Sequence, residues 1–410
     1  MEIRPILSAL LRHKTTAALI VIEIALSCAI VCNAVFIIGS RIEHMQRASG
    51  IAEDELVQLS TSSLMPDRNR DAMRLEDLAT LAAVPGVKSV SSINQIPYGD
   101  NVWVSGVNLE KEQSEPSLHA YTYMDDGGML QTFGLRVVEG RAFEPDEYID
   151  LSATEKADSP ATFGAALVTR TLAGHLFKDQ SAVGKTIYVW GDSPIRIVGV
   201  VDDLVGPGSS RASAAGDSRQ DYDSVILPGR ASNGQYTLRT TPERRAEVLK
   251  AAGDALLASD PNRLFHEQAV LTDMRRDFYS RDRAVVWLLA AVCIALLAVT
   301  ALGIVGLASF WVQQRTKQIG VRRALGATRG RILRHFQTEN FLLATVGIVL
   351  GMLAAYGINQ LLMTHYELPR LPWQYLPVGA LLLWTLGQLA VLGPARRAMS
   401  IPPAIATRSA

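Results

Sequence analysis

Long apolar runs alternate with charged stretches along this 410-residue chain. Four runs are long and apolar enough to predict transmembrane helices. They comprise residues 17–40, 284–312, 340–362 and 376–392. The second can cross a hydrocarbon core of about 30 Å with some tilt, and the fourth is the shortest. The first run is longer than the apolar region of a signal peptide, and a poor cleavage context follows it, so we expect a retained anchor.

Basic residues predict the orientation of these helices. The segment Gln313–Phe336 (QQRTKQIGVRRALGATRGRILRHF) carries seven Lys or Arg and no acidic residue. Further basic residues flank the first and fourth runs, namely Arg4, Arg12, Lys14, Arg396, Arg397 and Arg408. Short loops rich in Lys and Arg stay on the cytoplasmic side. We therefore expect residues 1–16, 313–339 and 393–410 to be cytoplasmic, with residues 41–283 and the short loop 363–375 outside.

The large external segment, residues 41–283, differs in charge from the rest of the chain. It carries 26 basic and 36 acidic residues, although the whole chain is balanced at 40 of each. A net charge of −10 in this segment argues against a nucleic-acid partner. Its 243 residues are enough to bury their own core.

Hydrophobic spacing in this segment predicts a mixed α and β domain. Helices are expected at Asp71–Val84, Thr171–Phe177 and Pro242–Leu257. Strands are expected at 87–93, 102–107, 119–124, 166–169, 187–190, 195–201, 224–227 and 236–240, and loops at 144–160 and 206–221. Single β-α units that leave and return suggest two subdomains, the second inserted into the first. We also expect Arg41–Ala48 and Gln268–Arg283 to extend the flanking spans outward as continuous helices, forming a stalk.

Motifs for catalysis and cofactor binding are missing from the sequence. Gly184-Lys185-Thr186 matches the end of a phosphate-binding loop, but Asp179 stands where its first glycine belongs, so a turn before a strand is the simpler interpretation. The seven histidines lack ligand spacing, and no G-x-S-x-G occurs. We expect no catalytic, metal or cofactor site in this chain. The three cysteines, Cys28, Cys32 and Cys293, fall in apolar runs and are expected to be small packing residues.

Two polar residues stand inside the first apolar run. A carboxylate at membrane depth is costly, so Glu23 is expected to pack against protein or, alternatively, to serve in coupling or proton relay. Asn33 is expected to form a hydrogen bond between helices.

Several motifs together resemble the MacB and FtsX-like permease family of ABC transporters, the type VII or mechanotransmission group. The loop QQRTKQIGVRRALGATRGRIL and the ending PARRAMSIPPAIATR are similar to the family's cytoplasmic segments. LAAVPGVKSVS, FGLRVVEGRAF, ALVTRTLAGHLF and SAVGKTIYVWGDSPIRIVGVVDD resemble the MacB-type periplasmic core. The resemblance covers nearly the whole chain. It implies a dimer of four-span subunits, each with a porter-like and a second, inserted subdomain outside the bacterial inner membrane.

The resemblance also implies cytoplasmic ABC ATPase subunits that dock on the loop after the second span. Only about sixteen residues precede the first span, so we expect the ATPase, with its ATP and Mg, to be a separate chain. In the docking loop we expect the segment Ile319–Arg331 to form one helix that seats in the ATPase. The residues expected to couple to it are Ile319, Gly320, Val321, Arg322, Arg323, Leu325, Gly326 and Arg331.

Two classes of function follow from the resemblance. In the first, the chain is an efflux permease that moves a substrate from the periplasm or outer leaflet, as a homodimer or with a similar permease, together with a periplasmic adaptor and outer-membrane channel. In the second, an FtsX-like regulator relays ATPase cycles to an extracytoplasmic partner such as a cell-wall hydrolase. Lipoprotein release is a nearby alternative. The external domain has the size expected of the exporter type.

Overall fold

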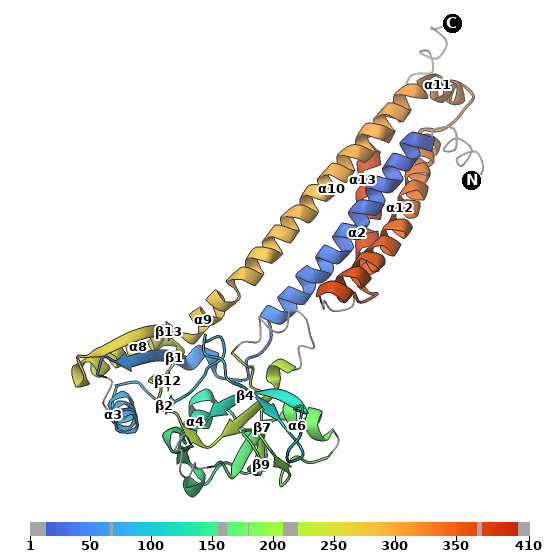
Figure 1. Ribbon diagram of the computed structural model, residues 1–410. Helices are drawn as coiled ribbons and strands as arrows, with labels where there is room; N and C mark the ends of the chain where they lie inside the picture. Colours follow the sequence, from blue (N-terminus) through green and yellow to red (C-terminus); the bar gives the residue numbers. More distant parts are fainter. Residues whose placement is uncertain are drawn as a thin grey trace. The chain divides into compact units, whose positions relative to one another are not determined.

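The computed structural model describes residues 14–65, 69–154, 162–178, 180–207, 220–366 and 371–400. The chain divides into two compact units, a helical one formed by the residues up to Met45 and from Arg281, and an external one formed by Gln46–Ser280 (Figure 1).

Four long helices build the helical unit. They are α2 (Lys14–Met45), α10 (Ser280–Gln314), α12 (Arg329–Tyr366) and α13 (Tyr375–Met399), with the short α11 (Thr316–Ala324) between α10 and α12. All four long helices are long and apolar enough to cross a membrane. The predicted apolar runs fall within them, which confirms the predicted number of apolar helices.

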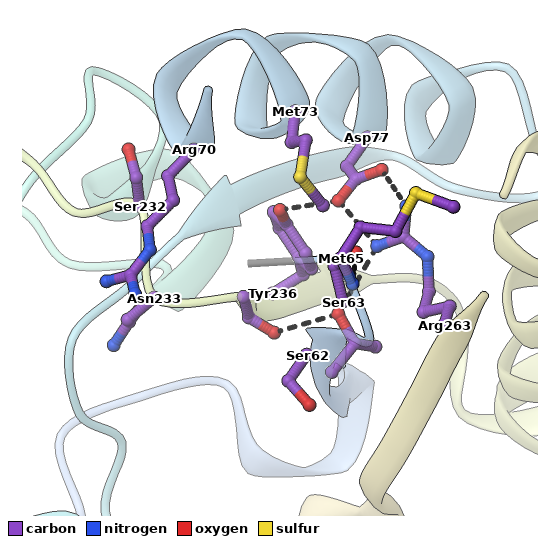
Figure 2. A pocket seen from close by; sticks show the side chains of 12 residues that line it. Ser62, Ser63, Met65, Arg70, Met73, Asp77, Ser232, Asn233, Tyr236 and Arg263 are labelled. Atoms are coloured by element: carbon purple, nitrogen blue, oxygen red, sulfur yellow. Dashed lines mark hydrogen bonds and ion pairs between the residues drawn. The ribbon is translucent and has the colours of Figure 1, made fainter. Parts of the chain in front are cut away.

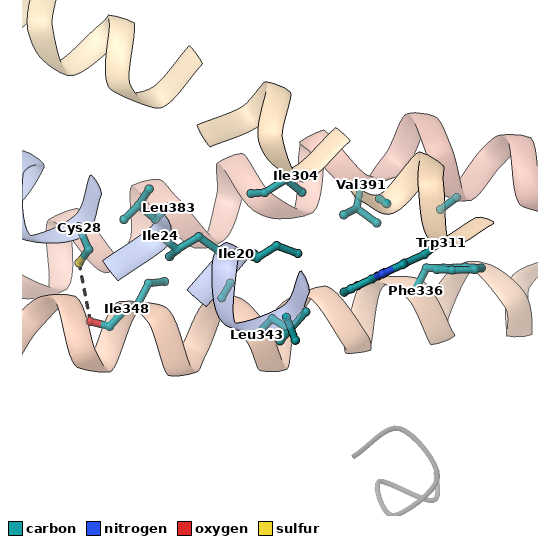
Figure 3. Close-up of a cluster of buried hydrophobic side chains, with 14 of the residues drawn as sticks. Ile20, Ile24, Cys28, Ile304, Trp311, Phe336, Leu343, Ile348, Leu383 and Val391 are labelled. Atoms are coloured by element: carbon teal, nitrogen blue, oxygen red, sulfur yellow. Dashed lines mark hydrogen bonds between the residues drawn. The ribbon is translucent and has the colours of Figure 1, made fainter. Parts of the chain in front are cut away.

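The core of the helical unit consists of apolar side chains from all four long helices. Figure 3 shows Ile20 and Ile24 of α2 among Leu343 and Ile348 of α12 and Leu383 of α13. Close approach of α2 and α12 depends on glycines of α12. A Cβ at Gly347 would lie 2.9 Å from side-chain atoms of Ile24, and one at Gly351 would lie 2.5 Å from the Cβ of Cys28. Small residues spaced by four are a common way for membrane helices to pack closely.

The first subdomain of the external unit is a four-stranded sheet covered by two helices. In chain order its elements are β1 (Leu56–Ser63), α3 (Arg70–Ala82), β2 (Ser89–Ser92), β12 (Gln235–Arg239), α8 (Arg245–Ser259) and β13 (Arg263–Val270). The strand order is β13-β1-β12-β2 with all neighbours antiparallel, the split β-α-β arrangement of ferredoxin-like sheets. Val57, Leu59 and Leu238 form its core with residues of α3 and α8. The side chain of Asn69 accepts hydrogen bonds from the N–H groups of Asp71 and Ala72, which starts α3.

The second subdomain lies in the chain between β2 and β12, so the predicted insertion is confirmed. Its larger sheet has the order β3-β4-β10-β7-β9-β5, and β8 pairs with β9. These strands are β3 (Val104–Val107), β4 (Leu118–Met124), β5 (Val137–Gly140), β7 (Ala165–Thr169), β8 (Thr186–Ile187), β9 (Ile195–Val201) and β10 (Ser224–Leu227). The smaller elements are α4 (Met129–Phe133), α5 (Leu151–Thr154), α6 (Arg170–Phe177), β6 (Ile149–Asp150), β11 (Gly229–Arg230), η2 (Pro145–Glu147) and η3 (Gln220–Tyr222). Gly184 has φ of +86° and precedes β8, as expected for a turn before a strand.

The predicted stalk helices are partly wrong. Residues 268–283 do not form one helix, because Gln268–Val270 pair with β1, with Val270 opposite Val57. The helix α9 (Leu271–Phe278) follows and ends at Tyr279, where φ is −87° and ψ is 10°, before α10 begins. The first span does continue outward, but only to Met45.

Other differences concern short elements. The strand predicted at 187–190 is reduced to β8 and an isolated bridge between Tyr188 and Asn108. The predicted loop 144–160 contains η2, β6 and α5, and residues 155–160 lie outside the described part of the chain. In the second predicted loop, 206–221, residues 208–219 also lie outside it. The sequence pattern does not predict the strands β1, β5, β11 and β13.

Candidate functional site

The helix α11 lies between α10 and α12 and ends in a glycine turn. The N–H of Gly326 donates to the carbonyl of Arg323, and the N–H of Ala327 donates to the carbonyl of Arg322. This pair of bonds is a Schellman motif, which requires a left-handed residue at its centre. Gly326 has φ of +91°. The predicted single helix Ile319–Arg331 is therefore wrong, because the chain turns at Gly326 and Arg331 belongs to α12.

Burial divides the predicted coupling residues into two groups. Ile319 and Gly320 are buried, Ile319 in the apolar core of the helical unit, so they hold α11 in place. Val321 and Leu325 are 51% and 83% exposed. Arg322, Gly326 and Arg331 are also exposed, and Arg323 is half-buried. The structure thus presents two apolar side chains beside basic ones on the surface of this segment.

An ion pair that the sequence analysis missed fixes the junction of α10 and α12. Both carboxylate oxygens of Glu339 accept from Nη1 of Arg315, at 3.1 and 3.0 Å. Glu339 is nearly fully buried, and the Arg315 guanidinium lies 5.8 Å from the ring centroid of Trp311. The sequence does contain a signal, because Glu339 is the single acidic residue between positions 284 and 366.

Polar residues of α2 face α10 and α12. A Cβ at Gly303 of α10 would lie 2.5 Å from a carboxylate oxygen of Glu23, so Glu23 lies directly against this glycine. One helical turn further, the Ser27 and Thr300 hydroxyls are 2.7 Å apart. The side-chain amide of Asn33 donates to the carbonyl of Ala355 of α12, at 3.3 Å.

Near the other end of α2, Arg41 forms an ion pair with Asp282 of α10. The Asp282 side chain is 7% exposed and that of Arg41 is 35% exposed. This contact ties together the two helices through which the chain leaves and re-enters the helical unit.

The first subdomain of the external unit contains a pocket of about 310 Å³ between α3 and the ends of β1, β12 and β13 (Figure 2). On one wall, Nη2 of Arg263 donates to Asp77 Oδ1 at 2.6 Å, and the Tyr236 hydroxyl donates to Asp77 Oδ2 at 2.7 Å. Met65 and Met73 add apolar surface, and the serines and Asn233 on the lining add hydrogen-bonding groups.

The pKa values of this wall follow from its burial. Burial, and then the charge of Asp77, raises the pKa of Tyr236 above its ordinary value. Burial alone would lower the pKa of Arg263, but hydrogen bonding to Asp77 and the negative charges around the guanidinium together outweigh it, and the net shift is upward. Tyr236 therefore stays neutral beside the ion pair of Asp77 and Arg263. Among the described residues, no group of three or more His, Cys, Asp or Glu could hold a metal ion.

Comparisons with known families match both units. Residues 290–403 match the family described as FtsX-like permease C-terminal, and residues 18–257 match the MacB-like periplasmic core domain. A membrane-helical unit interrupted by a periplasmic core domain defines a permease-type membrane protein. The chain belongs to the MacB/FtsX-like permease family of ABC transporters.

Several relatives are similar over most of the chain. The uncharacterized ABC transporter permease YknZ of Bacillus subtilis is 24% identical, with 99% of this chain and 98% of that protein covered. The macrolide export ATP-binding/permease protein MacB of Bradyrhizobium diazoefficiens is 29% identical over 82% of this chain and 48% of its own length. The pyoverdine export ATP-binding/permease protein PvdT of Pseudomonas aeruginosa is 25% identical over 86% and 50%. The chain thus spans nearly all of YknZ and about half of MacB and PvdT.

Two solved structures are similar to part of this chain. The extracellular domain of the noncanonic ABC-type transporter YknZ from Gram-positive bacteria is 16% identical, with 51% of this chain and 100% of that one covered and a TM-score of 0.33. The periplasmic region of MacB from Actinobacillus actinomycetemcomitans is 13% identical, with 57% and 95% covered and a TM-score of 0.35.

Proposed function

We propose that the chain is the permease subunit of an ABC exporter in the bacterial inner membrane. Cytoplasmic ATPase subunits on separate chains dock on α11, and their cycle of ATP binding and hydrolysis moves the external domain. The movement drives a substrate outward from the periplasm or outer leaflet. Both termini face the cytoplasm in this proposal, which rests on the basic residues around α11 and at the chain ends.

The observation that carries the proposal is the exposure of Val321 in the short helix α11 and of Leu325 directly after it, between two apolar helices. Leu325 is 83% exposed, although full burial of a leucine side chain is worth about 1.5–3 kcal/mol. Arg322 beside it is exposed and can form charge-assisted hydrogen bonds with carboxylates of a partner. A partner surface with an apolar cleft and an acidic rim would fit this segment.

Similarity to relatives supports the other parts of the proposal. YknZ is called a permease and aligns with this chain end to end, which supports an ATPase on a separate chain. The names of MacB and PvdT describe export, and both match the helical and external units of this chain. A dimer, with an identical or a similar permease, and a periplasmic adaptor with an outer-membrane channel complete the proposed assembly.

The test is a pull-down of the ATPase from membranes that contain the chain with Leu325→Asp. In the proposed contact this change buries an unpaired carboxylate, so ATPase recovery should fall at least tenfold, equivalent to about 1.4 kcal/mol or more. Gln313→Asp is the control, because it adds the same charge at an exposed position in the last turn of α10. Membrane abundance must be equal for all three chains. Unchanged ATPase recovery with Leu325→Asp would remove α11 from the mechanism.

A further inference from the structure

The two ends of the external unit meet at one guanidinium group. Arg275 of α9 donates from Nη1 to both carboxylate oxygens of Glu53, at 2.9 and 2.7 Å. Its Nη2 donates to the backbone carbonyl of Arg47, at 2.7 Å. Arg47 lies two residues after the end of α2, and only Tyr279 separates α9 from α10. Arg275 therefore joins the segment that follows α2 to the helix that precedes α10.

A tyrosine in an unusual conformation completes this joint. Tyr98 has φ of +68° and is only 7% exposed, and its hydroxyl donates to Glu53 Oε1 at 2.7 Å. The guanidinium of Arg275 lies 5.6 Å from its ring centroid. Phe278 and Tyr279 contact the same ring edge to face, with centroids 5.5 and 5.9 Å away. A left-handed conformation is unfavourable for a non-glycine residue and persists only where surrounding contacts enforce it.

The joint also reaches the second subdomain. Tyr98 lies in the segment that leads from β2 into that subdomain. On the return side, Asp221 of η3 forms an ion pair with Arg47, and the Tyr222 hydroxyl donates to the carbonyl of Ala48 at 2.8 Å. The segment after α2 is therefore bonded both to α9 and to the inserted subdomain.

Arg275 and Glu53 are largely shielded from solvent, which makes this joint stiffer than an ion pair on the surface. The side chains of Arg275 and Glu53 are 24% and 13% exposed. Nη1 contacts both oxygens of the carboxylate, and the third bond, to a backbone carbonyl, comes from Nη2 of the same planar group, so the guanidinium is fixed in direction as well as in distance. Lysine has a single donor atom and cannot span these three acceptors in one geometry.

We infer that Arg275 is the positioning residue through which movement of the helical unit is passed to the inserted subdomain. The inference rests on the proposed function, since it assumes that ATP hydrolysis moves the membrane helices. Arg275 holds the two ends of the external unit and Tyr98 together as one rigid group. Displacement of α2 relative to α10 then changes the orientation of the second subdomain instead of loosening the connecting segments.

The experiment uses the full chain with the ATPase that co-purifies with it, in lipid nanodiscs. Spin labels are placed on cysteines introduced at Asp192, in the second subdomain, and at Asp254 of α8, both of which are exposed. The native cysteines are buried in the helical unit. The distance between the labels is measured with and without ATP, and ATP turnover is measured on the same samples.

We expect the ATP-dependent change in this distance to be lost in Arg275→Ala, while ATP turnover continues at the unaltered chain's rate. Arg275→Lys should keep the fold and the rate of ATP turnover but reduce the ATP-dependent change in the distance between the labels. Arg276→Ala is the matched control, because that neighbouring side chain is 66% exposed and its ion pairs with Asp273 and Asp277 of α9 are 3.5 and 3.8 Å long. It should behave like the unaltered chain.

Glu53→Gln tests the joint if Arg275→Ala folds poorly, since it preserves shape and removes the charge. A full ATP-dependent change in Arg275→Ala or in Glu53→Gln would overturn the inference and leave the proposed function intact. If the unaltered chain shows no ATP-dependent change, the proposed function fails and the inference fails with it.

Discussion

Individual buried charges in the external unit each have specific partners. Asp77 and Arg263 are 2% and 3% exposed at their side chains, yet they lie between apolar strands and α3. Such a pair gains little net stability relative to apolar residues of the same size, but the loss of one member leaves a buried charge without its counter-ion. Removal of one member should therefore cost more stability than replacement of both members by apolar residues.

Arg263→Met is expected to destabilise the external unit by about 3–5 kcal/mol. The carboxylate of Asp77 would stay buried without its counter-ion, although it would still accept the hydrogen bond from Tyr236. The double variant Asp77→Leu with Arg263→Met should recover most of that loss. Urea unfolding of residues 46–280 measures both. Equal stability of Arg263→Met and the unaltered domain would contradict the argument.

The buried carboxyl group of Asp125 makes the stability of the external unit depend on pH. Burial raises the pKa of Asp125 to about 6, and the charge of Asp126 adds to the shift, against hydrogen bonds from the N–H groups of Gly127 and Met129. An aspartate in an unfolded chain has a pKa of about 3.9. Because the folded value is higher, the stabilisation from protonation is complete below about pH 4 and is lost as the pH rises through about 6.

Lowering the pH from 7 to 5 should therefore stabilise the unaltered domain by on the order of 1 kcal/mol relative to Asp125→Asn. The comparison with Asp125→Asn removes contributions from other groups, such as Glu55, whose pKa is lowered, first of all by its hydrogen bond with Arg239. Unfolding free energies at both pH values test this. Parallel profiles for the two proteins would show that Asp125 does not titrate in this range.

At the scale of elements, close packing of α2 on α12 depends on glycine. A Cβ at Gly351 would lie 2.5 Å from the Cβ of Cys28 and 2.6 Å from the carbonyl oxygen of Ala25. Both neighbours are backbone or near-backbone atoms, so neither can move away without a shift of the whole helix. Gly357 of the same helix has no such neighbour within 4 Å.

Gly351→Ala should destabilise the helical unit by about 1–3 kcal/mol through overpacking. Gly357→Ala should leave it unchanged or stabilise it slightly, because alanine favours a helix over glycine. Thermal unfolding of the full chain in detergent gives the comparison. The same melting temperature for both variants would mean that α2 and α12 do not pack closely in the membrane.

At the scale of the whole molecule, the helical and external units have separate cores. The four apolar helices and the family match make the chain a multi-pass membrane protein with a periplasmic core domain. The proposed orientation of the helical unit rests on basic residues alone, and it decides whether α11 can meet a cytoplasmic ATPase.

Cysteine labelling in cells tests this orientation. A cysteine at Asp192 should react with a membrane-impermeant thiol reagent once the outer membrane is permeabilised. One at Thr328, which is exposed in the loop after α11, should react only after the inner membrane is opened. The native cysteines are buried and provide the background. The reverse pattern would invert the topology and remove the proposed docking site from the cytoplasm.

The sequence by itself determined the number of apolar helices, the inserted second subdomain and the basic loop. The apolar helices and the basic loop are local properties, because about twenty consecutive residues decide whether a helix can span a membrane. Clear α and β periodicity likewise identified α3, β9 and β10. The candidate coupling residues came from a contiguous motif, and their role stays a prediction.

Only the tertiary structure decided the features that depend on distant residues. The ends of β1 and β13 pair Val57 with Val270, and this pairing makes a strand of residues that were expected to start a helix at Gln268. Burial separated Ile319, which holds α11, from Leu325, which faces outward. The contact of Arg275 with Glu53 and Arg47 joins residues more than two hundred positions apart. Sequence periodicity reports which face of an element is apolar, but the residues that meet that face are chosen by the fold.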